Sequence, residues 1–293
     1  MKRILIIEGG GADGLFAIGA VKYFIQDRGL EFDAMFGTSI GGAIILSLAC
    51  DFTRSRSWIQ ACDQTIADFT GINKWDLLDR LTWGFFFGGY LKSNIKKLTN
   101  NLFARNMVMS DLAIHCEVFA TDVDAIEPIK CISNGYRVDD ACAITTNVPG
   151  VFSYFEDPFT KNRLFDGGVA CNSPIAYAIK YAQHGSILSD DWKNVEFYLI
   201  RLGNYKSLDK KKVITATGLL IHCFSIARME CERLSIKLSV ALESETRNKG
   251  YKLNVLHMPY DLGLLEFNSQ TNMSHVNKGY EYAKRYYANH PNW

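Results

Sequence analysis

Neither sign of charge dominates this 293-residue sequence. The chain carries 32 Lys and Arg against 31 Asp and Glu, which gives a formal net charge of +1 at pH 7. It contains no basic run with interleaved aromatic residues. Nucleic-acid binding depends on such basic patches, so the composition gives no reason to expect a nucleic-acid partner.

The eight cysteines form no Cys-x-x-Cys pair, and no cluster of His, Cys, Asp and Glu has the spacing of metal ligands. The sequence therefore predicts neither a zinc site nor a dithiol redox motif, and it implies no cofactor. The cysteines are scattered through apolar segments. This placement is typical of free, buried thiols in a reducing cytosol.

Long apolar runs are missing as well. The run Ile4–Ile7 is too short for the core of a signal peptide, and the longest apolar stretch, near Ala43–Cys50, is too short to span a bilayer. We therefore expect a soluble, cytoplasmic chain that can still contact a membrane surface.

Short apolar runs alternate with segments of helical periodicity. This alternation predicts an α/β fold in which helices cover both faces of a mostly parallel central sheet. Strands are expected at 4–7, 32–37, 115–121, 126–132, 195–202 and 252–258. Helices are expected at 15–26, 40–50, 53–69 (capped by Thr53), 91–103, 138–146, 173–181, 213–243 and 273–288.

A glycine-rich turn, GGGADG, follows the first predicted strand. Gly9, Gly11 and Gly14 match the G-x-G-x-x-G fingerprint of dinucleotide-binding folds. That fingerprint also needs an acidic residue at the end of the second strand, where this chain has another glycine motif. Glu31 and Asp33 lie before that strand or at its start, and no Gly-Lys-Ser/Thr follows. Nucleotide binding is therefore disfavoured.

The second glycine motif, GTSIG, lies between a predicted strand and a predicted helix. Gly37-x-Ser39-x-Gly41 has the pattern of a nucleophile elbow, in which a sharp turn leaves the serine exposed. The dipole of the following helix would favour an anion that develops at Ser39. On its own the motif is weak, because glycine and serine are common in turns.

An activated serine needs a base, and two candidates remain. Asp166, in Asp166-Gly167-Gly168, ends a short apolar segment and could be either a base on a loop or a simple turn residue. His257 lies near the end of a predicted strand, and its place in the chain suits a Ser…Asp…His order. The other histidines have no comparable context.

Taken together, the three motifs resemble those of the patatin-like phospholipase family. Further similarity lies in EVFATDVDAIEPI, in ACAITTNVPGVF and in DGGVACNSPI. The likeness covers a motif-bearing core at about 2–182. The resemblance implies a three-layer sandwich in one domain over 1–293, with a helical C-terminal elaboration at about 183–293.

The resemblance also implies a mechanism, namely a serine–aspartate dyad without histidine. Ser39 would be the nucleophile and Asp166 the general base. The N–H groups of Gly9, Gly10 and Gly11 would form an oxyanion hole, which is worth roughly 3–4 kcal/mol per donor. The supporting motif glycines would be Gly14, Gly37, Gly41, Gly167 and Gly168.

The implied activity is that of a phospholipase A-type lipid acyl hydrolase. It would cleave phospholipid or related acyl esters at a membrane surface, without metal or cofactor. Two alternatives remain open. One is a Ser-Asp-His esterase or thioesterase of the α/β-hydrolase type with His257 as base, and the other is a non-catalytic lipid- or nucleotide-binding module.

Asp13 departs from the resemblance, because the family usually carries Arg or Lys at this place in the glycine loop. An acid that pointed at the site would disfavour a phosphate or an oxyanion. Asp13 either points away and pairs with a cation, or the substrate is less anionic than a usual phospholipid. As a first-turn acid it could also complement the helix dipole.

Two further segments leave their roles open. The stretch 75–90 gathers six aromatic residues between glycines, which fits either core packing or an apolar lid through which a lipid leaves the bilayer. The predicted helix 213–243 is apolar on much of its circumference. It fits core packing, a membrane-facing helix or a dimer face, so a homo-oligomer stays open.

Overall fold

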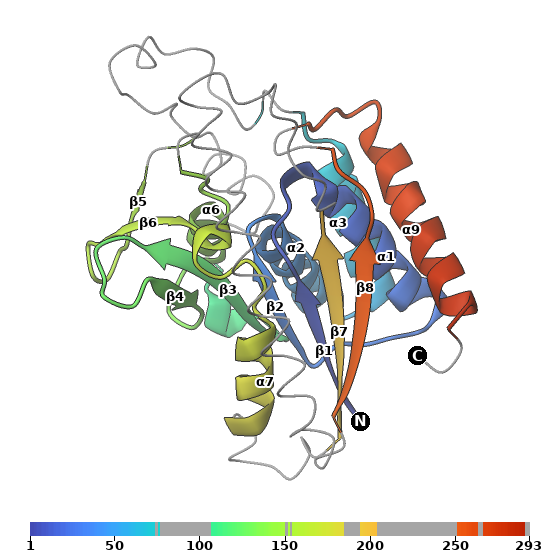
Figure 1. Cartoon of the computed structure of the whole chain (residues 1–293), viewed down its shortest axis with the longest axis horizontal. Coiled ribbons are helices and arrows are strands. Elements are labelled where there is room, and N and C mark those ends of the chain that lie inside the picture. Colours follow the sequence, from blue (N-terminus) through green and yellow to red (C-terminus); the bar gives the residue numbers. More distant parts are fainter. Residues whose placement is uncertain are drawn as a thin grey trace.

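The computed structural model describes residues 1–73, 76, 107–149, 152, 154–184, 194–203, 251–262 and 266–290. In this part of the chain, eight strands form one sheet in the order β5-β6-β3-β2-β1-β7-β8, with β4 also paired to β3 (Figure 1). The strands are β1 (Lys2–Ile7), β2 (Ala34–Thr38), β3 (His115–Asp122), β4 (Ile129–Ile132), β5 (Phe155–Glu156), β6 (Arg163–Asp166), β7 (Val195–Leu202) and β8 (Lys252–Met258).

The centre of the sheet is parallel and buried on both faces. Strand β1 pairs in parallel with β2 and β7, and its residues 4–7 are fully buried. The uninterrupted apolar run of β1 suits such a strand, because helices cover both faces of the sheet and each side chain is buried. The β4–β6 region adds antiparallel pairs at one edge. The sheet is therefore mixed, and the predicted α/β class with helices on both faces is confirmed.

Helices pack on both faces through two hydrophobic clusters. Leu5 and Ile7 of β1 face one cluster, and Ile4 and Ile6 face the other. The first cluster receives most of the helices, whereas the second receives α7 (Figure 1). The helices are α1 (Gly14–Lys22), continued by a π turn (Tyr23–Asp27), then α2 (Ile40–Ser55), α3 (Trp58–Thr70), α6 (Val138–Thr145), α7 (Ile175–His184) and α9 (Asn272–Ala288).

The predicted start of the third helix at Thr53 is wrong. Thr53 lies inside α2, where its hydroxyl donates to the Ala49 carbonyl at 2.7 Å. The cap of α3 is Ser57, whose side chain accepts from the Gln60 N–H at 3.3 Å. Thr53 and Ser57 are both residue types that favour a helix cap. Because α2 continues to Ser55, Ser57 takes the cap position of α3.

The strand expected at 126–132 begins later, because Asp122 organises a turn before it. The Asp122 carboxylate accepts from the N–H groups of Asp124 and Ala125, which leaves only residues 129–132 for β4. The β5–β6 hairpin was not predicted as a pair of strands. The expected helices 91–103 and 213–243 and the aromatic stretch 75–90, apart from Asp76, lie outside the described residues.

The C-terminal strands and helix are built onto the same sheet and core. Strands β7 and β8 extend the sheet beyond β1, and α9 packs along α1 on the outer side of the molecule (Figure 1). The expected terminal helix is thereby confirmed, while a single domain over 1–293 stays a prediction. The six cysteines in the described ranges are all free thiols. Within those ranges, no helix is both long and apolar enough to cross a bilayer.

Candidate active site

Ser39 lies on a sharp turn between β2 and α2. Its φ of 56° and ψ of −127° are strained for a residue with a side chain. A side chain at Gly37 would collide with the backbone of Gly41, and one at Gly41 would collide with the carbonyls of Ile7 and Glu8. The two glycines of GTSIG are therefore required by close backbone approach, which brings the start of α2 against the end of β1.

The register of β3 explains why Asp166 meets Ser39. Phe119 of β3 pairs with Thr38 of β2, and the next residue, Ala120, pairs with Asp166 of β6. Both partners lie on the same side of β3, because β4 occupies its other side along these residues. Strand β2 runs parallel to β3 and β6 runs antiparallel, so their carboxyl ends converge there. The Ser39 hydroxyl donates to Asp166 Oδ2 at 2.6 Å.

The Asp166 carboxylate is held on both sides. It is 1% exposed, and its Oδ1 accepts from the Gly168 N–H at 2.6 Å. The Thr121 hydroxyl donates to the Asp166 carbonyl at 2.8 Å. A side chain at Gly167 would collide with the Phe119 carbonyl, so the Asp-Gly-Gly turn must pass directly against β3. These contacts leave the carboxylate one orientation, toward Ser39.

Thr145, at the end of α6, supports the strained turn, and the sequence analysis did not identify it. Its hydroxyl accepts from the Ser39 N–H at 3.0 Å and donates to the Phe119 carbonyl at 2.7 Å. The side chain is fully buried. The segment ACAITTNVPGVF contributes only to the family resemblance, and nothing in its pattern distinguishes Thr145 from the neighbouring Thr146.

We expect Thr145→Val, which keeps the shape and removes both hydrogen bonds, to lower kcat about 10- to 100-fold with little change in KM. The Ser39 N–H would be left buried without an acceptor, so the nucleophile would lose its fixed position. Thr145→Ser keeps the hydroxyl and should stay within about threefold of wild type. Steady-state kinetics on a soluble short-chain ester, with thermal melts of each variant, measure this. A Thr145→Val variant that keeps wild-type kcat would show that these two hydrogen bonds are not needed for the reaction.

The glycine loop lies beside Ser39. A Cβ built at Gly9 would lie 3.1 Å from the Cβ of Ser39, and Gly14 packs against the Ile40 side chain. The Gly9 N–H donates to the Asn172 carbonyl at 3.3 Å. Among the described residues, the N–H groups of Gly10 and Gly11 donate no hydrogen bond. Two amides at the start of a helix are thus available for an acceptor that arrives with a ligand.

Asp13 follows the loop and is buried, with an exposure of 4%. It lies at the cap position of α1, yet its side chain makes no capping hydrogen bond to that helix. Its Oδ1 accepts instead from the Leu262 N–H at 2.7 Å, in the segment after β8.

The model of the family described as Patatin-like phospholipase matches residues 5–179. The chain belongs to the patatin-like phospholipase family. The match runs from β1 into α7, so it includes the glycine loop, Ser39 and Asp166 and excludes β7, β8 and α9.

Among solved structures, the chain is similar to VipD from Legionella pneumophila, with 11% sequence identity and a TM-score of 0.41. The alignment covers 97% of this chain and 66% of that chain, so the chain spans about two thirds of its length. The search of curated proteins returned no match.

In this patatin-like chain, His257 is far from the serine. It lies on β8, three strands from β2, which at the usual strand spacing is about 14 Å. Its Nε2 lies 2.9 Å from the Gly203 carbonyl. The side chain that reaches the Ser39 hydroxyl is Asp166. Within the part of the chain that the structure describes, no group of three or more His, Cys, Asp or Glu residues could hold a metal ion.

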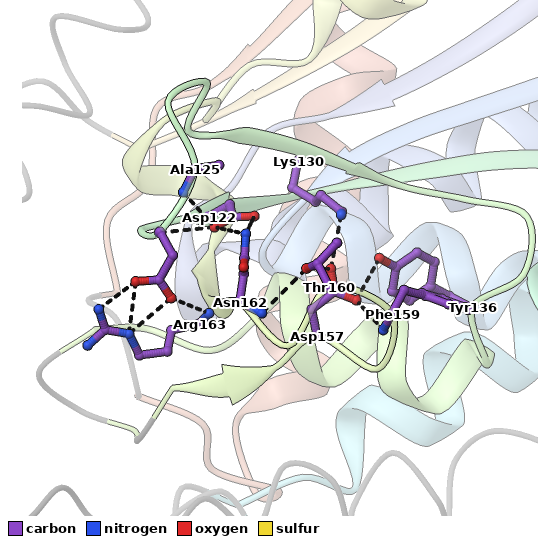
Figure 2. Close-up of polar contacts among 10 residues, drawn as sticks. Asp122, Ala125, Lys130, Tyr136, Asp157, Phe159, Thr160, Asn162 and Arg163 are labelled. Carbon is purple, nitrogen blue, oxygen red and sulfur yellow. Dashed lines mark hydrogen bonds and ion pairs between the residues drawn. The ribbon is translucent and has the colours of Figure 1, made fainter.

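The hairpin that ends in Asp166 is anchored to the patatin-like sheet by two buried carboxylates (Figure 2). Asp157 is fully buried and pairs with Lys130 at 2.9 Å. It also accepts from the Phe159 N–H and from the hydroxyls of Thr160 and Tyr136. Burial alone would raise the pKa of Asp157, but these hydrogen bonds outweigh it and lower the pKa to about 2.

Asp122 makes the second anchor, and it ties the β3–β4 turn to the hairpin. Its carboxylate accepts from the Asn162 amide at 2.9 Å, as Figure 2 shows. Next to it, Arg163 pairs with Asp124 and holds the pKa of that carboxyl near 2. The hairpin that carries Asp166 is therefore held by Asp122 of the β3–β4 turn and by Asp157 of its own turn.

We expect Asp157→Asn to lower the free energy of unfolding by roughly 2 kcal/mol at pH 7, because it leaves Lys130 without its buried partner. The pKa of Asp157 is lower in the folded than in the unfolded state, so its contribution is present above about pH 4 and is lost as pH falls toward 2. The difference between variant and wild type should shrink over that range in urea titrations.

The matched control is Glu156→Gln, since Glu156 and its partner Lys161 are 60% and 69% exposed and 3.7 Å apart. Its stability should stay close to that of wild type. A gap between Asp157→Asn and wild type that persists unchanged at pH 2 would contradict this account of the hairpin.

Proposed function

We propose that this chain is a phospholipase A-type lipid acyl hydrolase that uses Ser39 as nucleophile and Asp166 as general base. Membership in the patatin-like phospholipase family supports hydrolysis of lipid acyl esters. The observation that carries the finer assignment is the 2.6 Å hydrogen bond from the Ser39 hydroxyl to Asp166, made at a strained elbow. A base within hydrogen-bond reach of the proton it removes is the first geometric requirement for such a role.

In the acylation step, the Ser39 proton moves to Asp166 while Oγ attacks the ester carbonyl. The carbonyl oxygen becomes an anion, and the N–H groups of Gly10 and Gly11 are the donors placed to stabilise it. Collapse of this intermediate breaks the ester bond. Asp166 then returns its proton to the departing alcohol, which leaves the acyl group on Ser39.

In the deacylation step, water takes the place of the alcohol. Asp166 removes a proton from the water, the resulting hydroxide attacks the acyl-serine, and the second oxyanion is stabilised by the same amides. The proton returns to Ser39, and a fatty acid leaves. The Gly168 N–H on Oδ1 and the burial of Asp166 keep the carboxylate oriented through both steps.

The test is digestion of a total lipid extract, with products resolved by mass spectrometry. We expect wild-type protein to release fatty acids and lysolipids, and Ser39→Ala to release none above background. The matched control is Ser47→Ala, which changes a buried serine of α2 whose hydroxyl contacts Thr65 and not the site. Absence of Ser39-dependent fatty-acid release from every lipid class would refute the proposal.

A further inference from the structure

Asp13 is the residue of the glycine loop that departs from the family pattern, and its contacts run in two directions. Its backbone N–H donates to the Gly10 carbonyl at 3.2 Å and so closes the 3₁₀ turn η1 (Gly11–Asp13). Its carboxylate accepts from the N–H of Leu262, which is 249 residues away in the sequence. The residue therefore joins the glycine loop to a distant part of the chain.

The segment that contains Leu262 also contacts α1 through a second residue. Just before Leu262, Tyr260 stacks its ring on Phe16 with the centroids 4.2 Å apart. Helix α9 approaches the same residue, because a side chain at Gly279 of α9 would collide with the backbone of Phe16. Segment 259–262 and α9 together support the first turn of α1. Both lie beyond the part of the chain that matches the family, which ends at residue 179.

The hydrogen bond at Asp13 lies next to the part of the loop that carries the candidate oxyanion donors. Gly11 has a φ of 58°, a conformation that a flexible glycine leaves easily unless its neighbours hold it. A carboxylate can accept the Leu262 N–H, whereas an Arg or Lys side chain at this position would carry donors only. The acid at this position thus suits an anchor and does not suit recognition of a phosphate.

We propose that Asp13 is a positioning residue that anchors the glycine loop to segment 259–262 and so holds the Gly10 and Gly11 N–H groups in place for the reaction. This inference rests on the proposed function, because it assigns these amides a role in catalysis. The atom of Asp13 that makes this anchor is the carboxylate oxygen Oδ1, which accepts the Leu262 N–H. The main-chain N–H of Leu262, in the C-terminal third of the chain, thereby contributes to the active site.

The experiment compares Asp13→Asn, Asp13→Ala and Asp13→Lys in the whole 293-residue chain. Asparagine keeps an acceptor oxygen, so we expect kcat within about threefold of wild type. Alanine and lysine remove the acceptor and should lower kcat about 10- to 100-fold, with KM little changed. The control is Asp33→Ala, since Asp33 also accepts a distant main-chain N–H, that of Arg3 at 2.8 Å, at the opposite end of β1. It should keep wild-type kcat.

A second readout does not depend on catalysis. Hydrogen exchange of the Leu262 amide should be slow in wild type and Asp13→Asn and faster in Asp13→Ala. Wild-type kcat in Asp13→Ala, equal losses in the asparagine and alanine variants, or unchanged exchange at Leu262 would each overturn the inference. If wild type has no Ser39-dependent activity while exchange at Leu262 responds to Asp13→Ala, the anchor stands and the proposed function fails.

Discussion

Asp166→Asn is expected to lower kcat by at least about 10³-fold, and Ser39→Ala by as much, with no further loss in the double variant. Asparagine has nearly the same shape as aspartate and can still accept the hydrogen bond from the Ser39 hydroxyl. It cannot accept the proton, so the nucleophile stays a weakly reactive alcohol. Rates on a soluble short-chain ester measure this without interference from a lipid surface.

The control for this prediction is Asp33→Asn, which changes an acid at the far end of β2 and should leave kcat unchanged. Non-additivity is the sharper test, because two residues that act as one unit cannot each contribute separately. A loss in His257→Ala comparable to that in Ser39→Ala would favour the alternative Ser-Asp-His mechanism instead, whereas near-full activity would exclude it. Thermal melts of each variant separate loss of function from loss of fold.

The second large effect concerns the contact between α1 and α9. Gly279→Ala should lower the free energy of unfolding by about 3 kcal/mol, because the added methyl would collide with the backbone of Phe16. Backbone atoms cannot move aside as a flexible side chain can, so the two helices must separate. The expected change in melting temperature is a fall of roughly 6–12 °C. Gly19→Ala should lower the free energy of unfolding in the same way, because its added methyl would collide with the backbone of α9.

The matched control is Gly71→Ala at the end of α3. Gly71 has a φ of −76°, and an added Cβ would find its nearest neighbour at an ordinary 3.6 Å. Alanine there should be neutral or stabilising by up to about 1 kcal/mol, since it reduces the freedom of the unfolded chain. Equal melting temperatures for Gly279→Ala and Gly71→Ala would contradict the close packing of α1 on α9.

The sequence alone was sufficient to place the parts of the fold that depend on local pattern. The apolar run of β1 and the glycines of GTSIG predict a buried strand and a sharp turn, because each follows from residues that are neighbours in the chain. The resemblance favoured Asp166 over His257, because the Asp-Gly-Gly pattern alone fits either a base on a loop or an ordinary turn. The hydrogen bond between Ser39 and Asp166 then follows from pairing along β3, which no local pattern reveals.

The contacts that sequence reasoning missed join residues far apart in the chain. Thr145 is 106 residues from Ser39, and Leu262 is 249 residues from Asp13. Each depends on a single hydrogen bond between groups that are common throughout the sequence. Strand β5 has only two residues, too few for an alternating pattern, so the hairpin before Asp166 was recognised as no more than an apolar segment. Its stability comes from buried carboxylates, which sequence patterns do not distinguish from exposed ones.

The most direct test of the central claim is the reaction of the folded protein with a fluorophosphonate, followed by mass spectrometry of the intact chain and its peptides. We predict a single adduct on the peptide that contains Ser39, no adduct in Ser39→Ala, and labelling at least about 100-fold slower in Asp166→Asn. An unlabelled but well-folded wild-type protein, or an adduct on another serine that persists in Ser39→Ala, would contradict the account.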